Sequence, residues 1–185
     1  MTRLFRGLAR SLLLFGVVAC GLPLESAPRP YTQDEYLRSR ELMVPVQGVS
    51  SRQLRDTYSA PRGGGRAHLA LDIMSEKGTR VLAADDGFIL RIADNDLGGR
   101  TLYLSDPERR VVYYYAHLDK RVYGLEAGQR VKRGQLIATV GTTGNAPKDA
   151  PHLHFQLLQM GSGKQWWNGA PINPLPYLKQ KGNER

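Results

Sequence analysis

All four histidines of this 185-residue chain lie in three short, strand-like runs. His68 precedes Asp72 by four residues, His117 closes a run of valine and tyrosine, and His152 is two residues before His154. Imidazole nitrogens and carboxylate oxygens are ligands of catalytic zinc sites, in which three protein groups leave one position open for water. An imidazole that binds no metal could transfer protons, because histidine titrates near neutral pH. These residue types therefore fit a catalytic metal site.

The spacing suits β-strands, on which side chains at even separations point to the same face. His68 and Asp72 can thus share one face, as can His152 and His154, and a third strand can add His117. Each pattern alone is weak evidence, since such short motifs arise by chance and a single histidine is often structural. A helix would also bring His68 close to Asp72, although the glycines before them disfavour it. The combination is more informative, because no histidine is left over.

The elements that carry these residues are expected to be strands. Between residues 46 and 160, short apolar runs alternate with Gly, Asp and Asn breaks, and no helical periodicity of convincing length is present. The strand-like runs are 67–73, 80–84, 87–92, 100–104, 110–118, 130–132, 136–140 and 152–158. The pattern predicts an all-β domain.

The N-terminus has the pattern of an export signal. Residues 1–19 combine three arginines and no acidic residue with an apolar stretch too short to span a bilayer. Cys20 follows directly, and residues 17–20 resemble a lipobox, in which the cysteine is lipid-modified after cleavage. The alternatives are a plain signal peptide with an incidental cysteine, or a buried thiol. We predict a lipoprotein signal peptide at 1–19 and a lipidated tether at 20–45, in which Gln33–Leu42 could form a short helix.

Composition excludes several classes of protein. Hydrophobic residues at 41% and charged residues at 23% are globular values, which exclude wholesale disorder. A single cysteine excludes an intramolecular disulfide framework and a Cys-rich zinc module. The formal net charge of +9 falls to +6 once residues 1–19, with their three arginines, are removed. No basic stripe alternates with aromatic residues, so nucleic acid is not an expected partner of this exported chain.

The motifs together resemble one known family, the lysostaphin-type or LytM-like zinc peptidases, which are peptidoglycan endopeptidases. The resemblance rests, in chain order, on His68–Asp72, Gly78–Gly87, Tyr115–Leu118, Gly128–Gln135, Gly141–Gly144 and His152–Phe155. It covers roughly residues 46–160. It implies a compact, mostly antiparallel β barrel–sandwich hybrid with an active-site groove. We expect this peptidase domain at 46–177 and a flexible tail at 178–185.

The resemblance also implies a role for each candidate residue. His68, Asp72 and His154 would hold one Zn²⁺ ion, and His117 and His152 would be the catalytic pair that does not bind the metal. The implied reaction is metal-assisted peptide hydrolysis, in which zinc polarises the scissile carbonyl and lowers the pKa of a bound water. The catalytic pair would position that water, stabilise the oxyanion or protonate the leaving amine, and the sequence does not divide these roles.

Two positions depart from the family pattern. Ala70 stands where the family usually has glycine, which often marks a close backbone approach. The loop Asn145–Ala150 differs from the usual short Ser-Thr-Gly-Pro and is expected to border the groove.

Several neighbouring residues have two interpretations. Arg62 and Arg66 could contact substrate carboxylates or be solvated surface cations. Tyr113–Tyr115 and the pair Trp166–Trp167 could line the groove or simply pack.

The implied function is that of a zinc-dependent endopeptidase that hydrolyses peptide crosslinks of bacterial peptidoglycan. The chain would be exported and held at the periplasmic face by lipid on Cys20, at the outer membrane of a Gram-negative bacterium. Its expected partners are the peptidoglycan peptide, the membrane and an unidentified protein regulator. One alternative is a non-catalytic LytM-like lipoprotein that binds the cell wall and regulates other hydrolases. Such members usually lack one or more of the five candidate residues, all of which are present here. Another is a structural metal site in a binding lipoprotein, which leaves His117 and His152 unexplained.

Overall fold

The structure is a computed structural model that describes residues 31–161 and 163–179. The expected signal peptide at 1–19, the candidate lipidation site Cys20 and the end of the expected tail lie outside the described residues. Within the described residues, no helix is long and apolar enough to cross a membrane.

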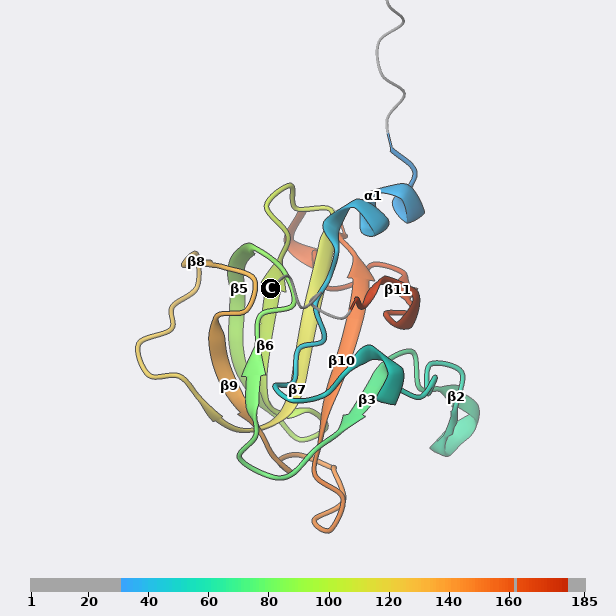
Figure 1. The fold of residues 1–185 in the computed structure, drawn as a ribbon, viewed down its shortest axis with the longest axis vertical. Helices are drawn as coiled ribbons and strands as arrows, with labels where there is room; N and C mark the ends of the chain where they lie inside the picture. The colour runs from blue at the N-terminus through green and yellow to red at the C-terminus, as the bar shows by residue number, and fades with distance from the viewer. Residues whose placement is uncertain (1–30, 162, 180–185) are drawn as a thin grey trace, which may run out of the picture. The chain divides into compact units, whose positions relative to one another are not determined.

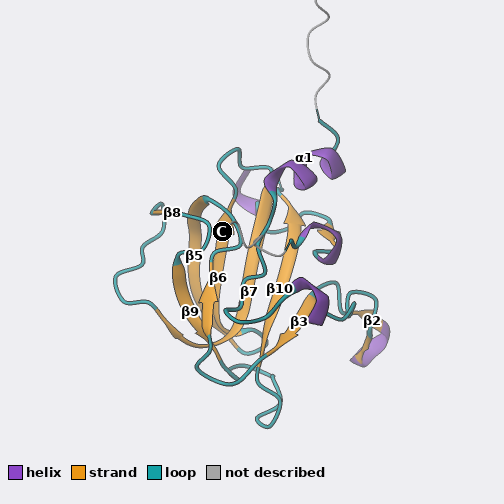
Figure 2. Ribbon diagram, in the orientation of Figure 1, coloured by secondary structure: helices purple, strands orange, loops and turns teal. Residues whose placement is uncertain are grey.

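The described part of the chain consists mainly of β-strands (Figure 2). The strands are β1 (Pro61–Arg62), β2 (Arg66–Ala67), β3 (Leu71–Met74), β4 (Arg80–Leu82), β5 (Gly87–Asn95), β6 (Gly99–Ser105), β7 (Val111–Arg121), β8 (Arg130–Val131), β9 (Leu136–Val140), β10 (His152–Gln159) and β11 (Pro171–Ile172). The helices are α1 (Gln33–Arg40) and the 3-10 turns η1 (Ser51–Gln53), η2 (Gly63–Gly65), η3 (Gly163–Gln165) and η4 (Leu175–Tyr177).

Strands β3 to β11 form one sheet, in which the longer strands lie side by side (Figure 1). Its main path is β11-β10-β7-β6-β5-β8, while β3 pairs with β10 and β9 pairs with both β7 and β4. Every pairing is antiparallel. The predicted all-β, mostly antiparallel fold is therefore confirmed, and the described strands do not close into a barrel.

Alternation along the central strands separates a hydrophobic core from a polar face. On β10, Leu153 and Phe155 are fully buried, and they pair with core residues of β3. On β7, Tyr113 and Tyr115 are also core residues, which confirms the packing interpretation for these two. Tyr114 lies between them and lines a cleft on the other face.

Helix α1 packs against the described strands through two adjacent buried side chains. Thr32 and Glu35 form a capping box at its start: Thr32 Oγ1 accepts the backbone N–H of Glu35 at 3.2 Å, and Glu35 Oε2 accepts that of Thr32 at 2.9 Å. The side chains of Tyr36 and Leu37 are buried in the core. Figure 1 shows the helix, in blue, lying over one end of the sheet.

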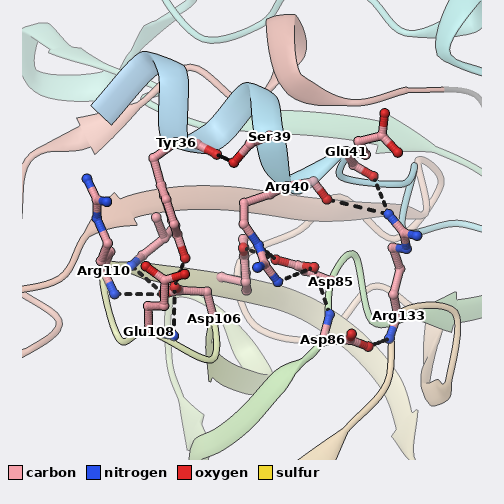
Figure 3. Close-up of polar contacts among 12 residues, drawn as sticks. Tyr36, Ser39, Arg40, Glu41, Asp85, Asp86, Asp106, Glu108, Arg110 and Arg133 are labelled. Carbon is pink, nitrogen blue, oxygen red and sulfur yellow. Dashed lines mark hydrogen bonds and ion pairs between the residues drawn. The ribbon is translucent and has the colours of Figure 1, made fainter. Parts of the chain in front are cut away.

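Two buried carboxylates accept hydrogen bonds from side chains of α1 and so hold the helix against the sheet (Figure 3). Arg40 donates two hydrogen bonds to Asp85, at 2.8 and 2.9 Å, and Tyr113 donates a third to the same carboxylate at 2.8 Å. Tyr36 donates to Asp106, which is fully buried. Residues 31–45, the described part of the expected tether, thus belong to the same compact unit as the strands.

Candidate metal centre

Strand β10 brings the candidate residues together because it lies between β3 and β7. Its His154 is paired in register with Asp72 on β3 and with Ala116 on β7, next to His117. His152, two residues earlier, points to the same face. All five candidate side chains therefore meet on one side of the sheet.

The three expected metal ligands form a cage of suitable size. Asp72 Oδ1 lies 3.0 Å from His68 Nε2 and 3.1 Å from His154 Nδ1, and these two nitrogens are 3.0 Å apart. Donor atoms held at 2.0–2.1 Å from a tetrahedral zinc ion are themselves separated by about 3.3 Å. The three residues offer ligand atoms that all lie within 4.8 Å of one another. Two imidazoles and a carboxylate are also the donor set that zinc prefers, so the residues fit the ion.

The neighbours of the cage hold its members in their ligand forms. The carbonyl of Thr57 accepts the Nδ1–H of His68 at 2.9 Å, which leaves Nε2 free to face the centre. Arg62 Nη2 donates to Asp72 Oδ2 at 2.5 Å, on the carboxylate oxygen that does not contact the histidines. Burial alone would raise the pKa of Asp72, but the adjacent His154 and His68 outweigh it and hold that pKa well below its usual range. Burial lowers the pKa of His154, which keeps this imidazole neutral.

The other two histidines are oriented by main-chain carbonyls. His117 Nδ1 lies 2.8 Å from the oxygen of Thr143, and His152 Nδ1 lies 2.8 Å from that of Ala150. Since a carbonyl can only accept, each Nδ1 carries the proton and each Nε2 is left as an acceptor. His152 Nε2 is 3.7 Å from Asp72 Oδ1, and the rings of His117 and His152 are 5.0 Å apart. Burial lowers the pKa of His117 to about 4 despite its bond to Thr143, so the ring is neutral at pH 7.

The local backbone differs from the continuous strand expected between His68 and Asp72. Strand β3 begins only at Leu71, because Leu69 has a φ of 58°, in the left-handed region that strands do not use. His68 and Asp72 therefore converge through a turn and not by strand alternation. His117 also has a positive φ, 59°, in the middle of β7. Non-glycine residues in this conformation are uncommon, and these two are the candidate residue His117 and the residue that directly follows His68.

The centre opens into a cleft of about 560 Å³. It is lined by Arg62, Gly63, Arg66, Ala67, His68, Leu97, Gly98, Tyr114, Ala116, His117, Asn145, Ala146, Pro147, His152, His154 and Gln156. The loop Asn145–Ala150 borders the cleft as expected, while Ala70 is fully buried outside it. Trp166 packs on Tyr103, and neither it nor Trp167 lines the cleft. A second hollow, of about 680 Å³, lies near Tyr123 and contains none of the candidate residues.

Residues that orient the histidines were not found by sequence reasoning. Thr57, Thr143 and Ala150 act through main-chain carbonyls, which have no side-chain signature. The one available signal was the Gly98-Gly99 pair. A Cβ atom on Gly99 would lie 2.4 Å from both the backbone N of Gly144 and the backbone C of Thr143, so the two loops touch backbone to backbone.

We predict that Gly144→Ala lowers the turnover expected of a peptidase about 100-fold without removing an expected metal ligand. Gly144 has a φ of 69°, and its Cβ would lie 2.3 Å from Gly99 N and 2.4 Å from Leu97 O, so the loop must move. That movement displaces the Thr143 carbonyl that orients His117, and a shift of about 1 Å can cost about 100-fold in rate. Rates and zinc content of the variant and of Gly124→Ala would be compared. Position 124 also has a positive φ but open space around its Cβ, and equal rates for the two variants would contradict the prediction.

The antiparallel sheet and the histidine–aspartate centre together define a lysostaphin-type metallopeptidase domain. A family model described as Peptidase family M23 matches residues 66–174, which is more than half of the chain. The chain therefore belongs to peptidase family M23, and the resemblance seen in the sequence motifs is confirmed.

Relatives within this family carry names that state different functions. The glycyl-glycine endopeptidase ALE-1 of Staphylococcus capitis is 34% identical over 119 residues, which are 64% of this chain and 31% of ALE-1. The murein hydrolase activator NlpD of Escherichia coli (strain K12) is 30% identical over 126 residues, which are 68% of this chain and 29% of NlpD. The chain thus spans less than a third of the length of either relative.

Solved structures show the same fold. The catalytic domain of lysostaphin from Staphylococcus simulans superposes with a TM-score of 0.54 at 31% identity, over 63% of this chain and 84% of that one. A zinc-containing peptidase from Vibrio cholerae superposes with a TM-score of 0.54 at 27% identity, over 66% of this chain and 36% of that one.

Proposed function

We propose that this protein is a zinc-dependent endopeptidase that hydrolyses peptide crosslinks of bacterial peptidoglycan. One observation carries the proposal: His117 and His152, which the metal cage does not need, face the same cleft as the cage and are oriented by carbonyls. A structural metal site requires its ligands only. The similarity to ALE-1, whose name states an endopeptidase activity, supports the same reaction class.

The side chains suit hydrolysis of an amide. A zinc ion held by His68, Asp72 and His154 would supply Lewis-acid activation of the scissile carbonyl and of a water molecule. The unprotonated Nε2 of His117 or His152 can accept a proton from that water. The protonated ring can then return the proton to the leaving amine or stabilise the developing oxyanion. Both rings lie in a nearly buried setting, where such interactions are stronger than in water.

The second candidate function is that of a non-catalytic activator of other murein hydrolases. The similarity to NlpD, named as such an activator, favours it. In that case the cleft would bind a cell-wall or protein ligand without hydrolysing it. The presence of both non-ligand imidazoles favours the peptidase.

The proposal also includes a cellular location for the protein. The export signal at 1–19 and the candidate lipid attachment at Cys20 would hold the domain at the periplasmic face of the outer membrane, where peptidoglycan lies. An unidentified protein regulator is a further expected partner. Metabolic labelling with a radioactive fatty acid tests the anchor, since Cys20→Ala should lose the label.

The deciding experiment is incubation of residues 21–185 with purified peptidoglycan, with and without a metal chelator. Release of crosslink-derived fragments that the chelator abolishes, identified as muropeptides, is the result expected of a zinc endopeptidase. Zinc binding without cleavage would reject it in favour of the activator. The fragments would also identify the bond that is cut.

A further inference from the structure

A small glycine-tipped hairpin lies beside the metal centre. Strands β1 and β2 form it, joined by Gly63–Gly65, and it lies beyond β3 at the edge of the sheet (Figure 1). Its contact with the centre is made by Arg62, which donates to Asp72. Arg62, Gly63, Arg66 and Ala67 all line the cleft that contains the histidines. The hairpin therefore forms one wall of the candidate active site.

The two arginines of this hairpin are placed directly opposite each other. The register of β1 and β2 pairs Arg62 with Arg66. Like charges at directly opposed strand positions are destabilising. No acidic side chain occurs among the described residues that line the cleft, and no ion pair of the described residues involves Arg66. Asp72 compensates the charge of Arg62 in part, and an anion bound beside Arg66 would offset the remaining repulsion between the two cations.

The guanidinium groups keep donors available for such an anion. Arg62 uses Nη2 on Asp72, while 46% of its side chain remains exposed. Arg66 Nε donates to the carbonyl of Gly63 at 3.3 Å, within the hairpin itself. Each planar guanidinium has five N–H donors. One internal hydrogen bond orients it, and two parallel N–H groups remain to bind a carboxylate.

We propose that Arg62 and Arg66 form a carboxylate-binding subsite that holds a free carboxylate of the substrate peptide on the β3 side of the metal centre. The inference rests on the proposed peptidase function and names a feature of its substrate: an acidic residue close to the scissile bond. The two sides of the cleft then differ in the charge of their lining residues. The opposite wall, formed by Leu97 and the loop at Asn145–Pro147, has no charged lining residue.

The test compares two synthetic crosslinked peptides that differ only in this carboxylate, as the free acid or as its carboxamide. We expect the wild-type protein to hydrolyse the acid with a kcat/KM about tenfold above that of the carboxamide. Arg66→Gln should bring the ratio close to one by slowing the acid alone. Arg130→Gln is the matched control, because it removes the same charge from β8, away from the cleft. It should keep the wild-type ratio.

Arg62→Gln should also reduce the preference for the acid, and zinc content is measured for this variant because Arg62 contacts Asp72. Equal rates for acid and carboxamide in the wild type would overturn the subsite. A preference retained by both Arg66→Gln and Arg62→Gln would overturn it as well. Unfolding by urea gives a further check: Arg66→Gln should not destabilise the protein, since it removes a repulsive pair.

Binding measurements separate this inference from the proposed function. Isothermal titration calorimetry would use non-hydrolysable versions of the two peptides, in which the scissile amide is N-methylated. The wild-type protein should bind the acid about tenfold more tightly than the carboxamide. Arg66→Gln should bind the two peptides equally. That result without hydrolysis of the natural bond would reject the peptidase and keep the subsite. Hydrolysis of both peptides with equal binding would keep the peptidase and reject the subsite.

Discussion

Replacing His154 by alanine is expected to abolish tight zinc binding and with it peptidase activity, whereas His117→Ala should bind zinc normally and lose turnover. His154 offers Nδ1 to the cage, 3.1 Å from Asp72 Oδ1. Its loss should weaken zinc binding by more than the roughly 10–100-fold that follows loss of a partner of a metal ligand. His117 has no atom in the cage, and removal of a proton-transfer group costs about 10²–10⁴-fold in rate.

Zinc stoichiometry after dialysis, affinity in competition with a chromophoric chelator, and the rate of muropeptide release distinguish the two variants. Tyr123→Ala is a suitable control because this side chain is fully exposed beside the second hollow. An unchanged rate in His117→Ala would exclude its catalytic role. Full zinc occupancy in His154→Ala would exclude this residue from the cage. Both findings are independent of which peptide bond is cut.

The general form of this site could be predicted from the sequence because its strongest signal is local. His152 and His154 are two residues apart with apolar neighbours, and β10 places both on one face, as strand periodicity requires. The fold class followed from short apolar runs between turn residues. The convergence of His68, Asp72 and His154 depended on the family resemblance, since separate motifs do not state which strands are neighbours.

The backbone details of the site could not be predicted. Leu69 and His117 have positive φ values, which leucine rarely adopts and which histidine adopts in only a small minority of cases. Long-range contacts impose it: the backbone N–H of Leu69 donates to Tyr58 O at 2.7 Å, and that of His117 donates to Gly98 O at 2.7 Å. The apolar run at 67–73 therefore predicts a strand through His68, whereas the chain turns there and β3 begins at Leu71.

Residues 31–45 show a second feature that the sequence pattern does not predict, namely contacts with residues far away in the chain. Their proline and charge content is typical of a solvated tether, and the short helix at 33–42 was the one structural element expected there. In the structure, Arg40 and Tyr36 reach buried carboxylates that follow 45 and 70 residues later in the chain. A charged residue appears solvent-exposed in a local window when its partner is distant in sequence. Such pairings become visible only in three dimensions.

We expect Asp85→Ala to lower the free energy of unfolding by about 3 kcal/mol. The Asp85 side chain is 3% exposed and accepts two bonds from Arg40 and one from Tyr113, whose hydroxyl lies in the core. Removing one partner of a buried pair leaves the other charge without compensation, which costs about 3–5 kcal/mol, and Arg40 retains some contact with solvent. The Tyr113 hydroxyl loses its acceptor as well.

Urea unfolding monitored by circular dichroism measures this effect, and Lys179→Ala is the matched control. Lys179 forms an ion pair with Glu41 in the same region, but both side chains are more than half exposed, so its loss should cost less than about 1 kcal/mol. Equal destabilisation by the two variants would show that the bonds from Arg40 and Tyr113 to Asp85 do not contribute to stability as proposed. If Asp85→Ala has the larger effect, as expected, a domain that begins at residue 46 lacks part of its own stabilising structure. Its catalytic properties should then be measured on a chain that includes residues 31–45.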